Sequence, residues 1–456
     1  MRSYSRSRSR RGRGGRIAGL ALAVAALGCG TYFHVNPPLE HWNRDRGYRN
    51  ELHERPQASD ELLLMLAFSG GGTRAAAFAY GVLEELAVTH VAFDGRVRSL
   101  VDEVDQVASV SGGSFTAAYL GLHGREAFKD FPERFLERDV QSALLLSLLS
   151  PINWLKLFSP YWERSDLAAE YYDRAIFDGA RFRDLEKVDR PFVVILATDL
   201  TTGSPFAFVQ EMFDFLCSDL LDYPVARAVA SSSAVPLVLS PITLRNYDGC
   251  GFEAPKWVSD AQFPGRELDR QYVNARNLSG YLAKRRRYVR LVDGVISDNL
   301  GVRGPFEKWS SYEAPEHRPK ENRTRETVLV IVNAQTTPDE RWDALDLLPS
   351  LAVILDAATS AQVNRYNFET IDLMKQKFKA WNARTGGWDP PERYTLIETS
   401  FVDVKDPHER AYLNGLSTSL HLPTEAVTRL RHAARQALRD DPAFQELIER
   451  LAAIDR

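Results

Sequence analysis

Apolar runs of strand length recur along the chain from residue 60 onward, and several end in glycine-rich turns. Leu62–Phe68 is a continuous apolar run, and Val104–Val110 is a second strand candidate. Further candidates are Phe192–Thr198, Tyr288–Val292 and Val328–Val332. A continuous apolar run of this length is typical of a strand that is buried on both faces.

Helical patterns lie between these strand candidates. They include Thr73–Leu86, the stretch after Gly113, a long segment near 340–380 and a helix pair at 423–454. Strands that alternate with helices predict a mostly parallel sheet with helices on both faces, which is a three-layer α/β/α fold. In such sheets, binding and catalytic sites form at the carboxyl ends of the strands.

The composition predicts four successive regions. Residues 1–28 are expected to be a signal peptide, and residues 29–59, which are polar, proline-bearing and aperiodic, a tether or a strap lying on the domain. Residues 60–310 hold the candidate site. Residues 311–456 are expected to complete the same core with a helical extension.

The amino terminus has the layout of a secretory signal. Residues 1–28 hold seven arginines and no acidic residue, and the apolar run Ile17–Cys29 is 13 residues long. As a helix this run spans roughly 20 Å, short of the roughly 30 Å hydrocarbon core. Ala26-Leu27-Gly28-Cys29 resembles a bacterial lipobox, in which Cys29 is lipidated. We therefore expect a lipoprotein anchored in the bacterial cell envelope, with a cleaved non-lipidated signal and an uncleaved anchor as alternatives.

The rest of the chain is acidic. Without residues 1–28 it carries 50 basic and 61 acidic residues, so it is a poor candidate for non-specific nucleic-acid binding. Three cysteines are too few for a disulfide scaffold or a Cys₄ metal site. If Cys29 carries lipid, Cys217 and Cys250 remain and are expected to pair in an oxidising compartment, with two free thiols as the alternative.

Ser111 lies at a predicted turn between strand and helix, in Ser109-Val110-Ser111-Gly112-Gly113. A nucleophile elbow needs such a sharp turn with small neighbours, which exposes the hydroxyl to substrate. The helix that follows presents N–H groups and a positive dipole end to developing negative charge. A serine that only caps the helix is the alternative.

Gly70, Gly71 and Gly72 follow the first predicted strand and precede a helix. Consecutive N–H groups in such a loop bind anions, as in phosphate cradles and oxyanion holes. Nucleotide binding is the rival hypothesis. The P-loop pattern is absent, however, and Ala75 stands where a dinucleotide fingerprint needs its third glycine.

Asp293 and Gly294 follow the strand candidate Tyr288–Val292. A carboxylate at the end of a strand can face the same crevice as Ser111, whereas a plain Asp-Gly turn is the alternative.

The order of these three turns resembles that of the patatin-like phospholipases, whose motifs are a glycine-rich oxyanion loop with a basic residue, G-x-S-x-G, and D-G-G or D-G-A. The resemblance covers roughly residues 60–440. It includes the strings Ala197–Gly203, Ala230–Pro236, Ser159–Trp162 with Arg164–Leu167, and Leu416–Pro423. The chain departs from the family pattern at Ser69, Ala75, Ser109 and Val295, the last two of which narrow the turns.

The resemblance implies a phospholipase A-type lipid acyl hydrolase with a Ser111–Asp293 dyad and no cofactor. The implied oxyanion hole consists of the N–H groups of Gly70, Gly71 and Gly72, of which Gly71 and Gly72 are the best donors. Three further glycines, Gly112, Gly113 and Gly294, support the turns. Arg74 is expected to steady the loop or add positive charge, with a surface arginine as the alternative.

Three other possibilities stay open. None of the nine histidines lies in a recognisable base or zinc motif, although a Ser-His-Asp hydrolase is possible because its partners need not be adjacent in sequence. We assign no metal. A non-catalytic envelope protein that binds lipid or a partner, and an esterase or thioesterase for small acyl groups, are the alternative functions.

Residues 143–162 are dense in leucine and aromatic residues. We expect most of this segment to be buried core, whereas exposure would make it a patch for a bilayer surface or an acyl chain. The basic stretch Lys284–Arg287 is expected to be a solvated loop, with phosphate headgroup binding as the alternative.

Overall fold

The computed structural model describes most of the chain from Asn36 onward. The described residues are 36–93, 95–158, 162–236, 238–260, 270–283, 286–303, 324–337, 346, 350–388 and 391–454. The predicted signal segment 1–28, Cys29, Lys284 and Arg285 lie outside them. Within the described ranges, no helix combines the length and the apolar character that are needed to cross a bilayer.

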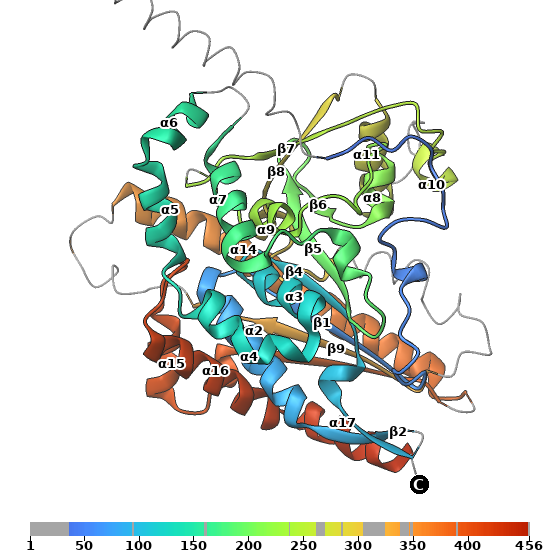
Figure 1. Ribbon diagram of the computed structural model, residues 1–456. Helices are drawn as coiled ribbons and strands as arrows, with labels where there is room; N and C mark the ends of the chain where they lie inside the picture. Colours follow the sequence, from blue (N-terminus) through green and yellow to red (C-terminus); the bar gives the residue numbers. More distant parts are fainter. Residues whose placement is uncertain are drawn as a thin grey trace, which may run out of the picture.

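A mixed sheet runs through the centre of the molecule (Figure 1). In the part of the chain that is described it has eight strands, in the order β10 (Arg393–Ser400), β9 (Glu326–Asn333), β1 (Leu62–Phe68), β4 (Val104–Val110), β5 (Phe192–Asp199), β8 (Tyr288–Asp293) and β7 (Ile242–Arg245), with β6 (Ser204–Ala207) paired to β5. The five strands from β10 to β5 are parallel, whereas β6, β7 and β8 are antiparallel to their neighbours. The predicted mostly parallel sheet is therefore confirmed, with an antiparallel edge.

Strand β9 shows why the central strands are continuously apolar. Val328, Val330 and Val332 join the larger hydrophobic core, while Leu329 and Ile331 join a smaller one. Alternate side chains of a strand point to opposite faces. Both faces of the sheet are therefore covered, as the absence of polar alternation predicts.

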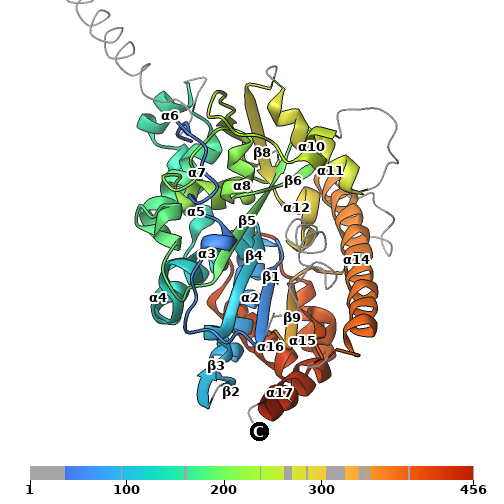
Figure 2. The same cartoon turned by 90° about the vertical axis from the view of Figure 1, so that its right-hand side faces the viewer.

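Two helical layers cover these faces. On one face lie α2 (Gly72–Val88), α3 (Gly112–His123), α16 (Thr424–Arg439) and α17 (Pro442–Ile454), whose buried side chains belong to the larger core. On the other face lies α14 (Leu351–Thr385), which supplies Ile371, Met374, Phe378 and Trp381 to the smaller core. Figure 2 shows the strands between α3 and α14. The three-layer α/β/α fold is thus confirmed.

Shorter elements surround the three layers. In the described part of the chain, the remaining α-helices are α4 (Ala127–Phe131), α5 (Val140–Leu148), α6 (Pro151–Leu157), α7 (Arg164–Tyr172), α8 (Gln210–Asp214), α9 (Val225–Ser232), α10 (Lys256–Ser259), α11 (Arg270–Ser279), α12 (Val295–Asp298) and α15 (Pro407–Asn414). Strands β2 (His90–Phe93) and β3 (Arg96–Ser99) form a separate antiparallel pair. Single 3₁₀ or π turns occupy Asn50–Leu52, Leu100–Glu103, Gly124–Glu126, Pro132–Leu136, Asp173–Phe177, Phe182–Leu185, Gly280–Leu282 and Phe401–Asp403.

Residues 36–59 lie on the domain as a strap, one of the two alternatives for this region. The Tyr48 side chain is fully buried, and its hydroxyl donates to the Val193 carbonyl oxygen at 3.1 Å. The buried Arg49 guanidinium forms an ion pair with Asp214 at 2.7 Å. Buried contacts of this kind hold the segment in place.

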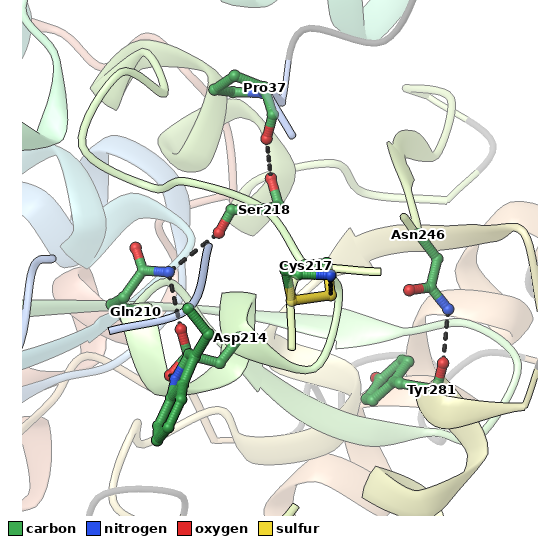
Figure 3. The surroundings of a disulfide bond; sticks show 9 residues. Pro37, Gln210, Asp214, Cys217, Ser218, Asn246 and Tyr281 are labelled. Atoms are coloured by element: carbon green, nitrogen blue, oxygen red, sulfur yellow. Dashed lines mark hydrogen bonds between the residues drawn. A yellow bond between two sulfur atoms is a disulfide. The ribbon is translucent and has the colours of Figure 1, made fainter. Parts of the chain in front are cut away.

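The expected pairing of Cys217 with Cys250 is present as a disulfide (Figure 3). The strap crosses it, because the Leu39 N–H donates to the Cys217 carbonyl and the Trp42 N–H donates to the Cys250 carbonyl, both at 2.8 Å. The Ser218 hydroxyl donates to the Pro37 carbonyl at 2.7 Å. The disulfide therefore holds the two loops on which the strap lies.

The expectation that most of residues 143–162 are buried was wrong. Leu145, Leu146, Leu149, Trp154 and Phe158 each expose more than half of their surface. Helices α5 and α6 project from the edge of the molecule (Figure 1). Helix α7 packs against α5, and among the described residues no further helix covers the outer face of α5 and α6.

Candidate active site

Ser111 occupies a strained turn between β4 and α3. Its φ of 49° and ψ of −118° lie in a region that non-glycine residues rarely adopt. This conformation costs free energy, and the strand and helix on either side of Ser111 hold the residue in it. The Ser111 side chain belongs to neither the strand nor the helix. The amino terminus of α3 begins at the next residue, Gly112, so its positive dipole end lies beside the Ser111 hydroxyl. This is the geometry of a nucleophile elbow.

Asp293 reaches the same place from an antiparallel strand. It ends β8, and only three residues of β8 pair with β5, the last pair being Ala197 with Asp293. The neighbouring residue of β5, Leu196, pairs with Val110 at the end of β4. Strand β8 begins beyond the carboxyl edge of the sheet and overlaps only the last three residues of β5. Its carboxyl end therefore lies beside the carboxyl end of β4. The expectation that Asp293 faces the same crevice as Ser111 is therefore correct, although β8 runs antiparallel to β5.

The Ser111 hydroxyl donates a hydrogen bond to the Asp293 carboxylate, with 3.0 Å between Oγ and Oδ2. The other carboxylate oxygen accepts the Val295 N–H at 3.0 Å. Both side chains are buried, Ser111 with 5% and Asp293 with 2% of its surface exposed. Burial raises the pKa of Asp293 to about 7, although the bonds from Val295 and Ser111 act in the opposite direction. The carboxylate is therefore a stronger base than an exposed aspartate.

The glycine-rich loop between β1 and α2 lies against this pair. A Cβ atom on Gly70 would lie 3.3 Å from the Ser111 Cβ and would clash with the Val295 side chain. A Cβ atom on Gly112 would clash with the Gly72 carbonyl oxygen. The three turns approach so closely that only glycine fits at these two positions.

The three predicted donors are not equivalent. The Gly70 N–H donates to the backbone and side-chain oxygens of Asn299, at 3.1 and 3.2 Å. For the N–H groups of Gly71 and Gly72, the described residues supply no acceptor. Their φ values of +137° and +62° are open to glycine and strained for other residues. Of the three loop amides, Gly70 therefore has its N–H occupied by Asn299, whereas the Gly71 and Gly72 N–H groups have no acceptor among the described residues.

Arg74 is buried and anchors the loop, which excludes the alternative of a surface arginine. Its guanidinium donates to the carbonyl oxygens of Ala334 at 3.0 Å and Leu416 at 2.6 Å, and to the Thr418 hydroxyl at 3.2 Å. These bonds join the first turn of α2 to the end of β9 and to the carboxyl-terminal segment 416–418.

The departures from the family pattern are accommodated. The Ser109 side chain is fully buried and donates to the Val194 carbonyl at 3.3 Å, so the extra hydroxyl bonds to β5. The Ser69 hydroxyl accepts the Ala334 N–H at 2.9 Å. Val295 packs over Gly70. The hydrogen bond between Ser111 and Asp293 forms with all of these side chains in place.

Ser232 contacts the site, although no pattern in the sequence predicts a role for it. Its hydroxyl oxygen accepts the backbone N–H of Ser111 at 2.8 Å and donates to the Leu196 carbonyl at 2.6 Å. It comes from the end of α9, within the serine-rich string 230–236 that looked familial. Asn299 and Thr198 were also missed, and the Thr198 hydroxyl donates to the Asp293 carbonyl at 2.8 Å. Tertiary contacts alone identify these partners.

A carboxylate, not a histidine, accepts the Ser111 hydroxyl. Among the residues that the structure describes, no three histidine, cysteine, aspartate or glutamate side chains are grouped as a metal site would require.

The chain is similar to several known proteins. A model of the patatin-like phospholipases matches residues 66–306, a range that contains the glycine-rich loop, Ser111 and Asp293. The uncharacterized protein YqhO of Bacillus subtilis (strain 168) is 28% identical over 193 residues, which are 40% of this chain and 59% of that protein. The aligned region therefore spans less than two thirds of this relative's length.

Two solved structures are similar to the chain at low sequence identity. Human GIVD cytosolic phospholipase A2 is 14% identical, with a TM-score of 0.42 over 87% of this chain and 61% of that chain. VipD from Legionella pneumophila is 12% identical, with a TM-score of 0.30 over 94% of this chain and 73% of that chain. Because the family model matches more than half of the present sequence, we conclude that this chain belongs to the patatin-like phospholipase family.

Proposed function

We propose that the chain is a lipid acyl hydrolase of phospholipase A type, which cleaves carboxylic esters through Ser111 and Asp293. The observation that carries the proposal is the 3.0 Å hydrogen bond from the Ser111 Oγ to a buried carboxylate. The pKa of Asp293, raised to about 7 by burial, matches a general base that works near neutral pH.

In the acylation step, the Ser111 Oγ attacks the ester carbonyl carbon and its proton passes to Asp293 Oδ2. The carbonyl oxygen becomes an oxyanion, which accepts hydrogen bonds from the N–H groups of Gly71 and Gly72. The amino terminus of α3 adds a positive dipole. Each such donor contributes on the order of 10²–10³ in rate. When the tetrahedral intermediate collapses, the ester bond breaks and Asp293 gives its proton to the leaving alcohol.

In the deacylation step, water attacks the acyl-serine and gives a proton to Asp293. The second tetrahedral intermediate uses the same oxyanion donors. Its collapse releases the fatty acid, and the proton returns from Asp293 to the Ser111 Oγ. Both half-reactions thus use one base, which is regenerated.

The test combines labelling with hydrolysis assays. A serine-directed fluorophosphonate should label Ser111, as mapped by mass spectrometry. Ser111→Ala and Asp293→Asn should each abolish ester hydrolysis while the circular dichroism spectrum is retained. Labelling at another residue, or full activity of either variant, would refute the proposal. Hydrolysis confined to short-chain esters or thioesters would favour the small-ester enzyme instead, and lipid binding without turnover the non-catalytic protein.

We also propose that the protein is anchored in a bacterial envelope membrane by a lipid on Cys29. The basic and apolar composition of residues 1–28 supports this. The Cys217–Cys250 disulfide also supports it, because such bonds persist in oxidising compartments outside the cytoplasm. Metabolic labelling with palmitate should mark the wild type and not Cys29→Ser, and equal labelling of both would contradict the proposal.

A further inference from the structure

Helices α5 and α6 present an apolar surface that the fold leaves uncovered. We define the α5–α6 patch as Leu145, Leu146, Leu149, Trp154 and Phe158, which are 57, 65, 68, 54 and 82% exposed. Between residues 140 and 158 the sequence has one charged side chain, Lys156, and that side chain is paired with Glu170 at 2.8 Å. Soluble domains rarely expose large apolar side chains in such a group unless the surface binds something.

The base of α5 lies beside the glycine-rich loop. The Gln141 side chain, in the first turn of α5, accepts the Leu420 N–H at 3.3 Å. The backbone carbonyl oxygen of the preceding residue, Ser419, accepts a hydrogen bond from the Thr73 N–H at 2.8 Å. Thr73 follows Gly72, so one short segment separates α5 from the proposed oxyanion donors.

A second group of exposed apolar residues lies close to Asp293 along the chain. The Ala234 carbonyl accepts the Asp293 N–H at 3.0 Å, and the next residue, Val235, is 40% exposed. Val238 is 66% exposed. The loop then returns to the start of α7, where the Ser165 N–H donates to the Ser240 hydroxyl at 3.2 Å. Short hydrogen-bonded segments therefore connect exposed apolar side chains both to the glycine-rich loop and to Asp293.

The strap begins at the same end of the molecule. Asn36 is fully buried, and its side chain is held by Ser218 and by the backbone of Arg245. In Figures 1 and 2, the beginning of the described chain and α6 both lie at the top of the view. Cys29 precedes Asn36 by seven residues, a length of chain that reaches at most about 25 Å. A lipid on Cys29 would thus hold this end of the molecule close to the membrane.

We infer that the α5–α6 patch docks on the surface of a phospholipid bilayer and turns the catalytic pair towards it. This inference rests on the proposed function in taking lipid as the substrate. Apolar insertion drives the docking, because the patch offers no unpaired cation and the body of the protein is acidic. Trp154 suits the interface, since its ring is apolar while its N–H donates to the Leu148 carbonyl at 2.6 Å.

Vesicle partition tests the docking separately from catalysis. The full chain with Cys29→Ser and Ser111→Ala, which has neither the lipid nor the nucleophile, is mixed with phosphatidylcholine vesicles. We expect it to bind, with little dependence on salt. Adding Leu145→Ser, Leu149→Ser and Phe158→Ser should lower the partition coefficient at least about tenfold. The matched control Val97→Ser with Phe368→Ser changes residues that are 75 and 70% exposed elsewhere, and should leave the coefficient unchanged.

Three results would overturn the inference. The first is equal partition of the patch variant and the control. The second is binding that needs anionic lipid and disappears in high salt. The third is a dimer that forms without lipid and is lost only in the patch variant, which would make a second copy of the chain the occupant of the patch. If the patch variant does not fold, phosphatidylcholine with brominated acyl chains serves instead. It should quench tryptophan emission more in the parent than in Trp154→Phe, and equal quenching would contradict docking. Vesicle binding without hydrolysis by the Ser111-containing chain would reject only the proposed function.

Discussion

The Ser232 hydroxyl oxygen accepts the backbone N–H of Ser111 at 2.8 Å, which ties the strained elbow to the end of α9. We predict that Ser232→Ala lowers kcat/KM by about tenfold to a hundredfold, because the Ser111 N–H loses its acceptor and the hydroxyl shifts from Asp293. Ser231→Ala is the matched control, since Ser231 is equally buried but donates within its own helix, to Arg227. Steady-state kinetics that showed the same loss for both variants would contradict this role.

The pH profile should report the buried base. Because burial raises the pKa of Asp293 to about 7, the carboxylate is protonated at acidic pH and cannot accept the Ser111 proton. We predict that kcat/KM falls tenfold per pH unit below about 7, and is constant above it until another group titrates. An acid limb centred near the ordinary aspartate value would show that Asp293 is not the base.

The same shift predicts that Asp293→Asn stabilises the fold at alkaline pH. Between the unfolded pKa and about 7 the folded state binds more protons, so the stability of the wild type falls as pH rises through this window. The amide carries no charge to desolvate. We therefore expect a gain of a few kcal/mol at most above about pH 7, which shrinks as the pH falls towards 4. Thermal unfolding at both pH values measures it, and a gain independent of pH would contradict the burial of a charge.

The sequence predicted those features that local composition determines. The bounds of β1 and β4 follow from apolar runs that end at glycine-rich or serine-glycine turns. The direction of β8 does not, because an apolar run is the same for a parallel and an antiparallel strand. The exposure of Leu149 and Phe158 was missed because a segment that is apolar all round shows no polar face.

The catalytic pair could be proposed only in part from the residues. Ser111 and Asp293 each had a plain structural alternative, and the order of three turns together with the family resemblance singled them out. Ser232 and Asn299 were not found, since a hydroxyl or amide carries no sign in the sequence of which distant backbone group it will meet. Such contacts depend on the tertiary packing of α9 and α12 against the turns.

Arg74 should matter for turnover more than for substrate binding. Arg74→Gln removes donors from the carbonyls of Ala334 and Leu416 and loosens the loop that carries Gly71 and Gly72. We predict a loss of about tenfold or more in kcat with little change in KM, because the oxyanion forms only after attack. Arg450→Gln is the control, since Arg450 also forms a partly buried ion pair, to Glu326 at 2.8 Å, but at the start of β9 and not at its end. It should lower the melting temperature without lowering kcat.

The disulfide should stabilise the strap as well as the loops that it joins. Cys217 and Cys250 are 33 residues apart, and their carbonyls accept the N–H groups of Leu39 and Trp42. We predict that replacing both cysteines by serine lowers the free energy of unfolding by about 2–4 kcal/mol and makes residues 36–59 a new site of proteolysis. Differential scanning calorimetry and limited digestion with mass mapping measure these two effects. Reductant should destabilise the wild type and leave the double variant unchanged. If the strap resists proteolysis in the double variant, its buried contacts at Tyr48 and Arg49 hold it without help from the disulfide.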